Sequence, residues 1–418
     1  MKNAANGDWK ADWPTWLMVG ATGFGGPAGQ IAILHREVVE RRQWLDEEEF
    51  LAALKVCMLL PGPEAQQLAT YAGWRRGGLP GGLVAGTLFV LPGAVLVTAL
   101  AWLHAAGGSW PLVAAAFAGT RPAVVALVAL AAWRIGRKSL TSPTAVVVML
   151  AALAALAGGI AFPVVVVAAG IIGIVLPGKV AAAPASSDAS TRPSGGRSSA
   201  FRHVVAVATT ATVVWAVCYG LVSATSVAGG RGAAVARLFT TTTLLSLGGA
   251  YAVVPWALDE SVARGWLDAD ERFTALAMGE ATPGPLILVV TFIGFMAGWK
   301  AAPAAALSAG FEGAAVATLF AFLPSFAMIF GLAPFVQSIH PRSWLGRAMT
   351  AVGAAVVAAI VLLAMKLAVA AFLPGGSVDL LAVVVAVGSA AALLAGRAST
   401  PVVVAAAAAI GVLASLVR

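Results

Sequence analysis

Two Pro-Gly-Pro triplets are the places where this chain could bind a ligand: Pro61-Gly62-Pro63 (the first triplet) and Pro283-Gly284-Pro285 (the second triplet). Each lies in an apolar stretch long enough to cross a bilayer, where proline removes a backbone donor and breaks a helix. Such breaks persist at membrane depth only where they are buried in protein or line a polar cavity. The helix that restarts after a break exposes free N–H groups and a partial positive charge, which can bind an anion.

The triplets belong to a block that occurs twice. Trp44-Leu45-Asp46 precedes the first triplet and Trp266-Leu267-Asp268 the second, with a constant offset of 222 residues. Each copy also begins with a glycine pair, Gly25-Gly26 in one and Gly248-Gly249 in the other. A duplicated break inside apolar sequence is therefore where we look for function.

The composition identifies the class of protein. Hydrophobic residues make up 60% of the chain and charged residues only 11%, well below the roughly 25% of a soluble protein. We predict an all-α integral membrane protein with broken helices and about 13 transmembrane segments. The segments fall near 14–34, 50–72, 79–104, 111–133, 143–160, 161–177, 203–222, 234–257, 273–298, 303–334, 347–373, 378–395 and 399–416. The Gly and Pro content of 14–34 and 50–72 would also suit re-entrant segments.

The basic residues predict the orientation. With the N-terminus placed in the cytoplasm, basic residues in the inside segments outnumber those in the outside segments by more than two to one. The net charge of +8 is therefore explained by membrane topology, and we expect no nucleic-acid partner. The polar N-terminus has no credible cleavage site, so we expect no cleaved signal peptide.

A linker divides the chain. Residues 178–202 are rich in Ala, Ser, Gly and Pro, as in a flexible cytoplasmic linker. We expect an N-terminal repeat over 1–177, a connecting transmembrane helix over 203–233 and a C-terminal repeat over 234–418. Seven predicted crossings separate the starts of the two copies, which makes the repeat inverted, as in many secondary transporters. The repeat would be parallel if 203–222 did not cross.

No motif predicts an enzyme, a metal or another cofactor. The four histidines are scattered without ligand spacing, and Cys57 and Cys218 lie in apolar runs. A GxxxxGK[ST] loop for direct ATP use is also missing from the sequence. A polytopic membrane enzyme is thus the weaker alternative, and a passive anion channel would not need an inverted repeat.

Three segments closely resemble the chromate ion transporter family in its long two-domain form. They are FGGPAGQIAILHREVVERRQWL (24–45), CMLLPGPEAQQLATYAGW (57–74) and GEATPGPLILVVTFIGFMAGW (279–299), and residues 120–128 and 247–256 fit the same family. The resemblance implies efflux of chromate across the bacterial inner membrane, chromate resistance, and energy from the proton motive force. Sulfate, a nearly isosteric dianion, is the usual competing substrate in such a family.

A tetrahedral dianion needs many hydrogen-bond donors, so we expect the substrate to bind at the breaks. The candidate residues are Gly25, Gly26, Pro61, Gly62, Pro63, Gln66, Gln67, Gly248, Gly249, Thr282, Pro283, Gly284 and Pro285. The glycine pairs would let backbone amides approach the ion, although tight helix packing explains them equally well.

Arg121 is the candidate cation. An arginine inside a span costs about 2.5–3.5 kcal/mol, so it usually faces a cavity or a partner. Its guanidinium could bind two oxygens of an oxyanion at once. The alternatives are a structural pair with Glu64 or Glu280, or a position nearer the membrane surface.

Glu64 and Glu280 flank the triplets and are candidates for proton coupling. Two ionised carboxylates would repel chromate, whereas a carboxyl that binds and releases a proton as access changes could drive transport. Glu64 could instead serve only as a partner for the helix dipole.

The alternatives for the whole protein are a transporter or exchanger of sulfate or another oxyanion. A homodimer is compatible with the sequence.

Overall fold

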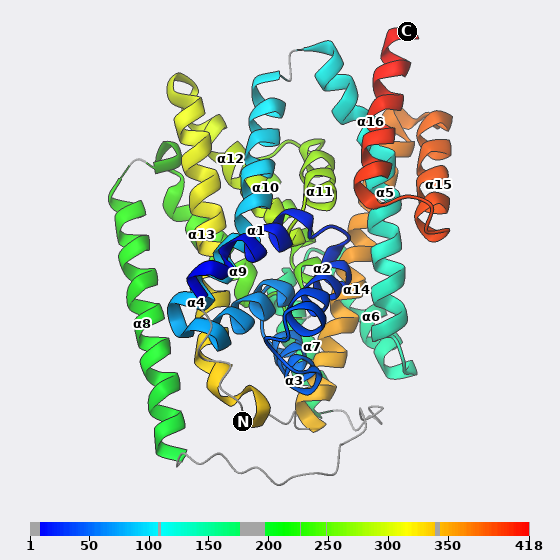
Figure 1. Cartoon of the computed structure of the whole chain (residues 1–418). Coiled ribbons are helices and arrows are strands. Elements are labelled where there is room, and N and C mark those ends of the chain that lie inside the picture. Colours follow the sequence, from blue (N-terminus) through cyan, green and yellow to red (C-terminus); the bar gives the residue numbers. More distant parts are fainter. Residues whose placement is uncertain are drawn as a thin grey trace.

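The computed structural model describes residues 9–107, 110–175, 197–225, 227–247, 249–338 and 343–417. Every regular element in these ranges is helical, as the composition predicts (Figure 1). Most of the predicted linker, 178–196, lies outside the described residues, and its last residues already belong to a helix.

The helices of the N-terminal half are α1 (Trp13–Thr22), α2 (Gly26–His35) with a π-helical continuation (Arg36–Arg41), α3 (Glu47–Leu59), α4 (Glu64–Gly107), α5 (Pro111–Ser139), α6 (Pro143–Ala157) and α7 (Phe162–Val175). After α8 (Arg197–Ala224), the C-terminal half contains α9 (Gly232–Leu244), α10 (Val254–Ala263), α11 (Glu271–Ala281), α12 (Val289–Ala301), α13 (Ala306–Leu332), α14 (Ser343–Phe372), α15 (Leu380–Leu394) and α16 (Thr400–Val417). The order of helices is the same in both halves, because α4 bends at Gly77 and Gly78 into two parts that correspond to α12 and α13.

The repeated Asp of the block makes a capping contact just before the helix that leads to each triplet. The Asp46 side chain accepts a hydrogen bond of 2.7 Å from the N–H of Glu49 at the start of α3. At the start of α11, the N–H of Asp268 donates to Glu271 Oε2 at 2.7 Å. These contacts are the two halves of a capping box, in which Asp and Glu three residues apart satisfy the free N–H groups of a helix end.

Both triplets are the tips of helical hairpins. Arg75 Nη2 lies 3.2 Å from Glu49 Oε2, although 26 residues separate the two along the chain. A straight helix of that length would hold them about 39 Å apart, so α3 and the first part of α4 must fold back at the first triplet. In the same way, Lys300 Nζ lies 2.7 Å from Glu271 Oε2 and closes the hairpin of α11 and α12 around the second triplet.

The hairpins change the predicted count of crossings. Segments 50–72 and 273–298 return to the end of the molecule from which they start, so neither is a straight crossing, and the number of about 13 is not confirmed. Hydropathy could not distinguish a folded-back pair of half-helices from one span of the same length. Within the described residues, six helices are long and apolar enough to cross a membrane: 64–107, 111–139, 202–224, 303–336, 346–372 and 400–417.

Glycines allow each returning half-helix to pack closely on the next long helix. A Cβ on Gly298 of α12 would lie 1.9 Å from the carbonyl oxygen of Ala309 in α13. A Cβ on Gly73 would lie 2.4 Å from the carbonyl oxygen of Gly81, at the matching place in α4. Side chains at these positions would push the helices apart. Glycine therefore lets each returning half-helix pack directly on the helix that follows it.

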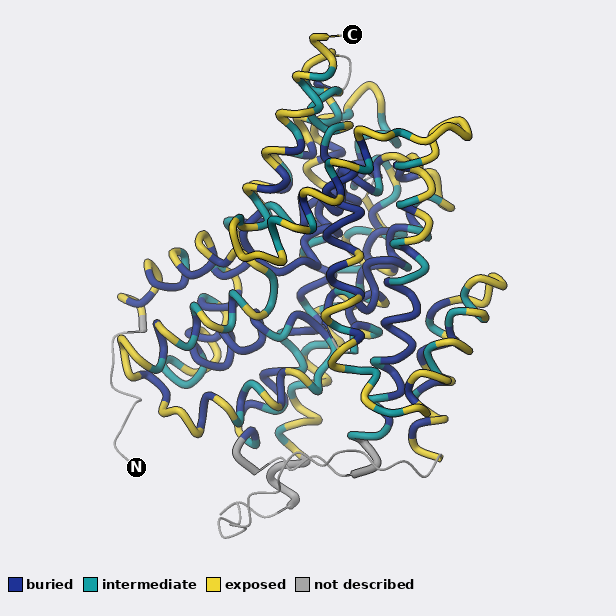
Figure 2. Tube along the Cα trace, turned by 90° about the vertical axis from the view of Figure 1, so that its right-hand side faces the viewer, coloured by how far each residue is buried: buried dark blue, intermediate teal, exposed yellow. Residues whose placement is uncertain are grey.

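The outer helices present apolar side chains to the surroundings. Figure 2 shows buried residues along the middle of the molecule and exposed residues on its outer helices. On α8, which lies at the edge of the molecule in Figure 1, Val213, Val217 and Leu221 are exposed. An apolar exterior of this kind is what a protein surrounded by lipid requires.

Candidate functional site

Each triplet is bonded to the first break of the opposite half. The N–H of Gly284 donates to the carbonyl oxygen of Gly23 at 3.0 Å. The N–H of Gly62 donates to Ser246 Oγ at 2.8 Å. Gly23 and Ser246 stand at matching places, two residues before the glycine pair of their own half. The four breaks therefore meet in two equivalent contacts between the halves.

Gln30 strengthens the contact of the second triplet. Its Nε2 donates to the carbonyl oxygen of Gly284 at 2.6 Å and to that of Gly23 at 3.2 Å. The side chain is only 1% exposed. Gln30 thus connects both breaks. No pattern in the sequence indicated this role, because Gln30 is an isolated polar residue in an apolar helix.

The first triplet lies in a buried polar network that contains the predicted Gln66 and Gln67. Gln67 Nε2 donates to the carbonyl oxygen of Pro61 at 2.7 Å, while its own Oε1 has no hydrogen-bond partner. Gln66 accepts from Ser325 Oγ at 2.8 Å and donates to Thr70 Oγ1 at 3.0 Å. Burying a polar network of this size in an apolar protein is costly unless its members are paired. The first triplet therefore lies in a region that could bind a polar ligand.

The long helices α4 and α13 contact the triplets through matching motifs, Leu91-Pro92-Gly93 and Leu323-Pro324-Ser325. A Cβ on Gly93 would lie 2.1 Å from the carbonyl oxygen of Pro283. On the other side, a Cβ on Gly62 would lie 2.9 Å from Ser325 Oγ. The long helix of each half therefore packs against the triplet of the other half.

The glycines of the breaks adopt conformations that other residues rarely adopt. The φ angles of Gly62 and Gly284 are +117° and +99°. Gly26 has a φ of +68°, and a Cβ there would meet no neighbour, so conformation and not tight packing accounts for this glycine. Gly25 and Gly249 also have positive φ angles, whereas Gly248 lies outside the described residues.

The two candidate carboxyl groups flank one turn. A Cβ on Gly249 would lie 3.4 Å from Glu64 Oε1. Two residues later, the hydroxyl of Tyr251 donates to Glu280 Oε1. Both glutamates are half-buried. The structure thus brings Glu64 and Glu280 to opposite ends of the short turn from Gly249 to Ala252, which the sequence did not predict.

Arg121 is placed at another site. Its Nη2 bonds to Asp270 Oδ2 at 2.9 Å, and its guanidinium lies 5.8 Å from the centre of the Phe273 ring. The partner is therefore neither Glu64 nor Glu280 but an acid at the start of α11. Thr282 is also engaged, since its hydroxyl donates to the carbonyl oxygen of Met278 at 2.6 Å.

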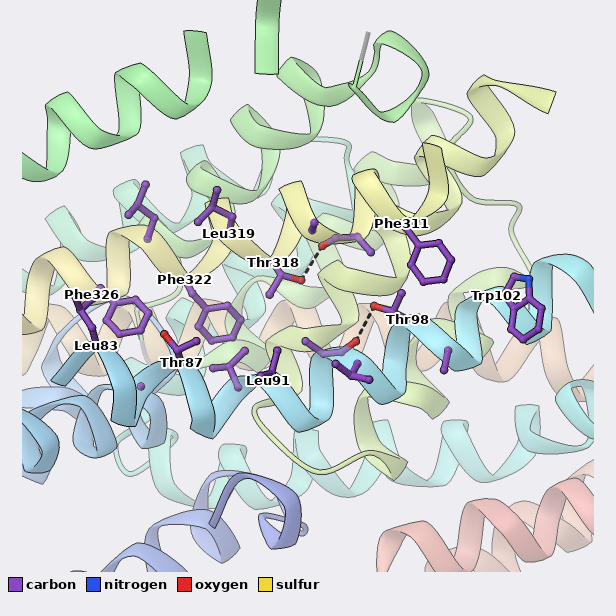
Figure 3. Close-up of a pocket in the computed structure, with 18 residues that line it drawn as sticks. Leu83, Thr87, Leu91, Thr98, Trp102, Phe311, Thr318, Leu319, Phe322 and Phe326 are labelled. Atoms are coloured by element: carbon purple, nitrogen blue, oxygen red, sulfur yellow. Dashed lines mark hydrogen bonds between the residues drawn. The ribbon is translucent and has the colours of Figure 1, made fainter. Parts of the chain in front are cut away.

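An apolar cavity of about 720 Å³ lies between α4 and α13 (Figure 3). Its lining includes Leu83, Leu91, Trp102, Phe311, Phe322 and Phe326. The hydroxyls of Thr98 and Thr318 donate to carbonyl oxygens of their own helices. No charged side chain lines this cavity, so it does not have the chemistry of an anion site. Over the described ranges, no group of three or more His, Cys, Asp or Glu could hold a metal ion.

Comparison with known proteins matches both halves. A family model described as "Chromate transporter" covers residues 13–174 and 233–412. The "Chromate transport protein" of Pseudomonas aeruginosa is 32% identical over 314 residues, which are 75% of this chain and 70% of that protein. The "Probable chromate transport protein" of Synechococcus elongatus is 28% identical over 323 residues, 77% of this chain and 75% of the relative.

A shorter relative matches only part of the chain. The "Uncharacterized transporter YwrA" of Bacillus subtilis is 31% identical over 114 residues, 27% of this chain and 64% of its own length. That relative is therefore about as long as one half of this protein. No solved structure matches the chain.

Proposed function

The chain belongs to the chromate transporter family, and on this premise we propose that it is a secondary active transporter that exports chromate across the bacterial inner membrane. The observation that carries the proposal is the reciprocal bonding of the two triplets: Gly62 to Ser246 and Gly284 to Gly23. Four helix breaks that meet at two equivalent contacts are the arrangement from which transporters build one central site.

The two halves, 1–177 and 234–418, form an inverted pair in this proposal, with the N-terminus in the cytoplasm. Figure 1 supports it by placing α3 toward the lower end of the molecule and α11, its counterpart, toward the upper end. A relative about as long as one half supports an origin by duplication.

In this proposal, alternating access depends on the hydrogen bonds of the amide groups in the two triplets. The N–H groups of Gly62 and Gly284, which would hold an oxyanion, donate to the opposite half instead. Chromate must therefore replace these contacts. We propose that one contact opens toward each side of the membrane in turn, and that the oxyanion takes up the freed donors and those of the Gln66–Gln67 pair.

Protons drive the export in this proposal, with Glu64 and Glu280 as the groups that bind and release them. The position of both carboxyls beside the turn from Gly249 to Ala252 supports it, because a change of charge there reaches the break of the C-terminal half directly. Arg121 remains a weaker candidate for substrate binding, since its observed partner is Asp270.

Flux in proteoliposomes under an imposed pH gradient tests the function. We expect chromate accumulation driven by the gradient and abolished by a protonophore, with sulfate as a weaker competitor. Transport of sulfate without chromate would change the substrate to another oxyanion, and gradient-independent leakage would indicate a passive channel. Arg121→Ala should retain chromate flux if its role is only the pair with Asp270.

A further inference from the structure

We propose that Tyr251 is a positioning residue for proton coupling, which holds the carboxylate of Glu280 against the turn that also contacts Glu64. This inference rests on the proposed proton-driven transport. Tyr251 is the side chain through which proton binding at Glu280 reaches a helix break.

The geometry connects both triplets through one turn. The Tyr251 hydroxyl donates to Glu280 Oε1, and Glu280 lies three residues before the second triplet. Gly249, at the beginning of the same turn, lies against the carboxyl of Glu64, which directly follows the first triplet. Because Gly249 has no side chain, the turn approaches Glu64 closely. A shift of this turn therefore changes contacts next to both triplets.

Among the described residues, the charge that acts on Glu280 from another helix is that of Arg134 on α5, which also acts on Tyr251. Tyr251 on the turn is neutral and acts on Glu280 through its hydroxyl. The other charged groups that pack against α11 contact its opposite end. Arg121 bonds to Asp270 there, and His104 and Lys300 bond to Glu271. Tyr251 is thus the direct hydrogen-bond partner through which the charge of Glu280 acts on the break.

The charge of Glu280 sets the strength of this contact. A hydrogen bond from a hydroxyl to an ionised carboxylate is roughly twice as strong as one to a neutral acceptor. When Glu280 takes a proton from the aqueous phase, the acceptor becomes neutral and the bond to Tyr251 weakens. The turn is then released from α11 and can move away from Glu64. Tyr251 keeps its own proton throughout, and Glu280 returns its proton to the other aqueous phase.

The test compares two kinds of flux through the full-length protein in proteoliposomes. Chromate exchange, measured without a pH gradient, requires binding and alternating access but no net proton movement. Gradient-driven accumulation also requires coupling. For Tyr251→Phe we expect exchange within about twofold of wild type and driven accumulation reduced about tenfold or more. Tyr219→Phe, whose ring stacks on Trp215 in α8, is the matched control and should retain both.

The outcomes separate the inference from the function. A wild-type protein that shows neither flux overturns the proposed function. A Tyr251→Phe variant with full driven accumulation overturns the inference alone, and equal loss of exchange and accumulation shows a merely structural role and overturns it as well. The thermal transition in detergent checks folding. If Tyr251→Phe fails this check, Glu280→Gln is measured in the same assays, and full driven accumulation in that variant contradicts the inference.

Discussion

The backbone N–H of Gly62 donates to the hydroxyl of Ser246, 184 residues further along the chain, at 2.8 Å. Ser246 is fully buried, and its hydroxyl also donates a hydrogen bond to the carbonyl oxygen of Thr243 at 2.6 Å. The tip of one hairpin is therefore fixed to a break of the other half by a single side chain.

Ser246→Ala should destabilise the contact between the halves. The substitution leaves the buried N–H of Gly62 without an acceptor, which costs about 1–3 kcal/mol. We expect a lower thermal transition in detergent and an altered concentration dependence of chromate flux. Ser308→Ala is the control, because the exposed Ser308 hydroxyl bonds only within its own helical turn. An unchanged transition in Ser246→Ala would show that the contact contributes nothing.

Gln30→Glu should impair transport more than Gln30→Leu. Leucine removes the donor that connects Gly23 and Gly284, whereas glutamate places a carboxylate against their two carbonyl oxygens. We expect initial rates of chromate uptake at least tenfold lower for the glutamate variant, with the leucine variant between it and wild type. Equal rates in all three proteins would exclude a function for the Gln30 amide.

Glu49→Ala should weaken the hairpin of the first triplet. Glu49 accepts from the Tyr71 hydroxyl at 2.7 Å and from Arg75, and it is 6% exposed. Loss of hydrogen bonds to a charged group of this kind costs about 1.5–3 kcal/mol. Glu260→Ala breaks a more exposed pair with Arg264 in one helix and should cost only about 0.5 kcal/mol. Chemical denaturation in detergent compares the two, and similar losses would contradict the hairpin role.

Single cysteines test the inverted repeat. In a protein whose Cys57 and Cys218 are replaced by serine, Glu48→Cys and Ala269→Cys introduce exposed thiols at the foot of each hairpin. An inverted pair presents these positions on opposite faces of the membrane. A membrane-impermeant maleimide should therefore label one of them, and not the other, in intact cells. Labelling of both in intact cells would require a parallel repeat.

His35 should make stability depend on pH. Hydrogen bonding to Glu47 is the largest cause that raises the pKa of His35 above its usual 6.5, and a second bond to Glu40 adds to it. A raised pKa means that the folded protein binds the proton more tightly than the unfolded one. The stabilisation is therefore complete below pH 6.5 and is lost as the pH rises through the raised value. His35→Gln should remove this dependence from the thermal transition, and an unchanged profile would exclude His35 as its cause.

The sequence predicted the breaks correctly, since Pro-Gly-Pro has few ways to continue a helix. It also placed Gln66 and Gln67 beside the first triplet, where the structure has a buried polar network. It could not predict which break meets which, because that depends on how the two halves pack. Gln30 and Ser246 therefore looked like ordinary polar residues.

Two further features depended on long-range contacts. The partner of Arg121 lies 149 residues away, and no spacing rule relates Arg121 to Asp270. The folding back of the hairpins had one usable signal. Each apolar segment has an acidic residue at one end and a basic residue at the other, Glu49 with Arg75 and Glu271 with Lys300. This pattern is expected where two antiparallel half-helices are joined by an ion pair at one end.

The contacts of the two triplets are equivalent in position but different in chemistry. In an assembly of two identical chains, both would have to be the same, and one mutation would alter both. In this single chain the serine hydroxyl on one side and the glutamine amide on the other can each be changed alone. In the proposed alternating-access mechanism, the free energies needed to open the inward and outward routes can therefore be set independently, which allows the protein to favour one resting orientation.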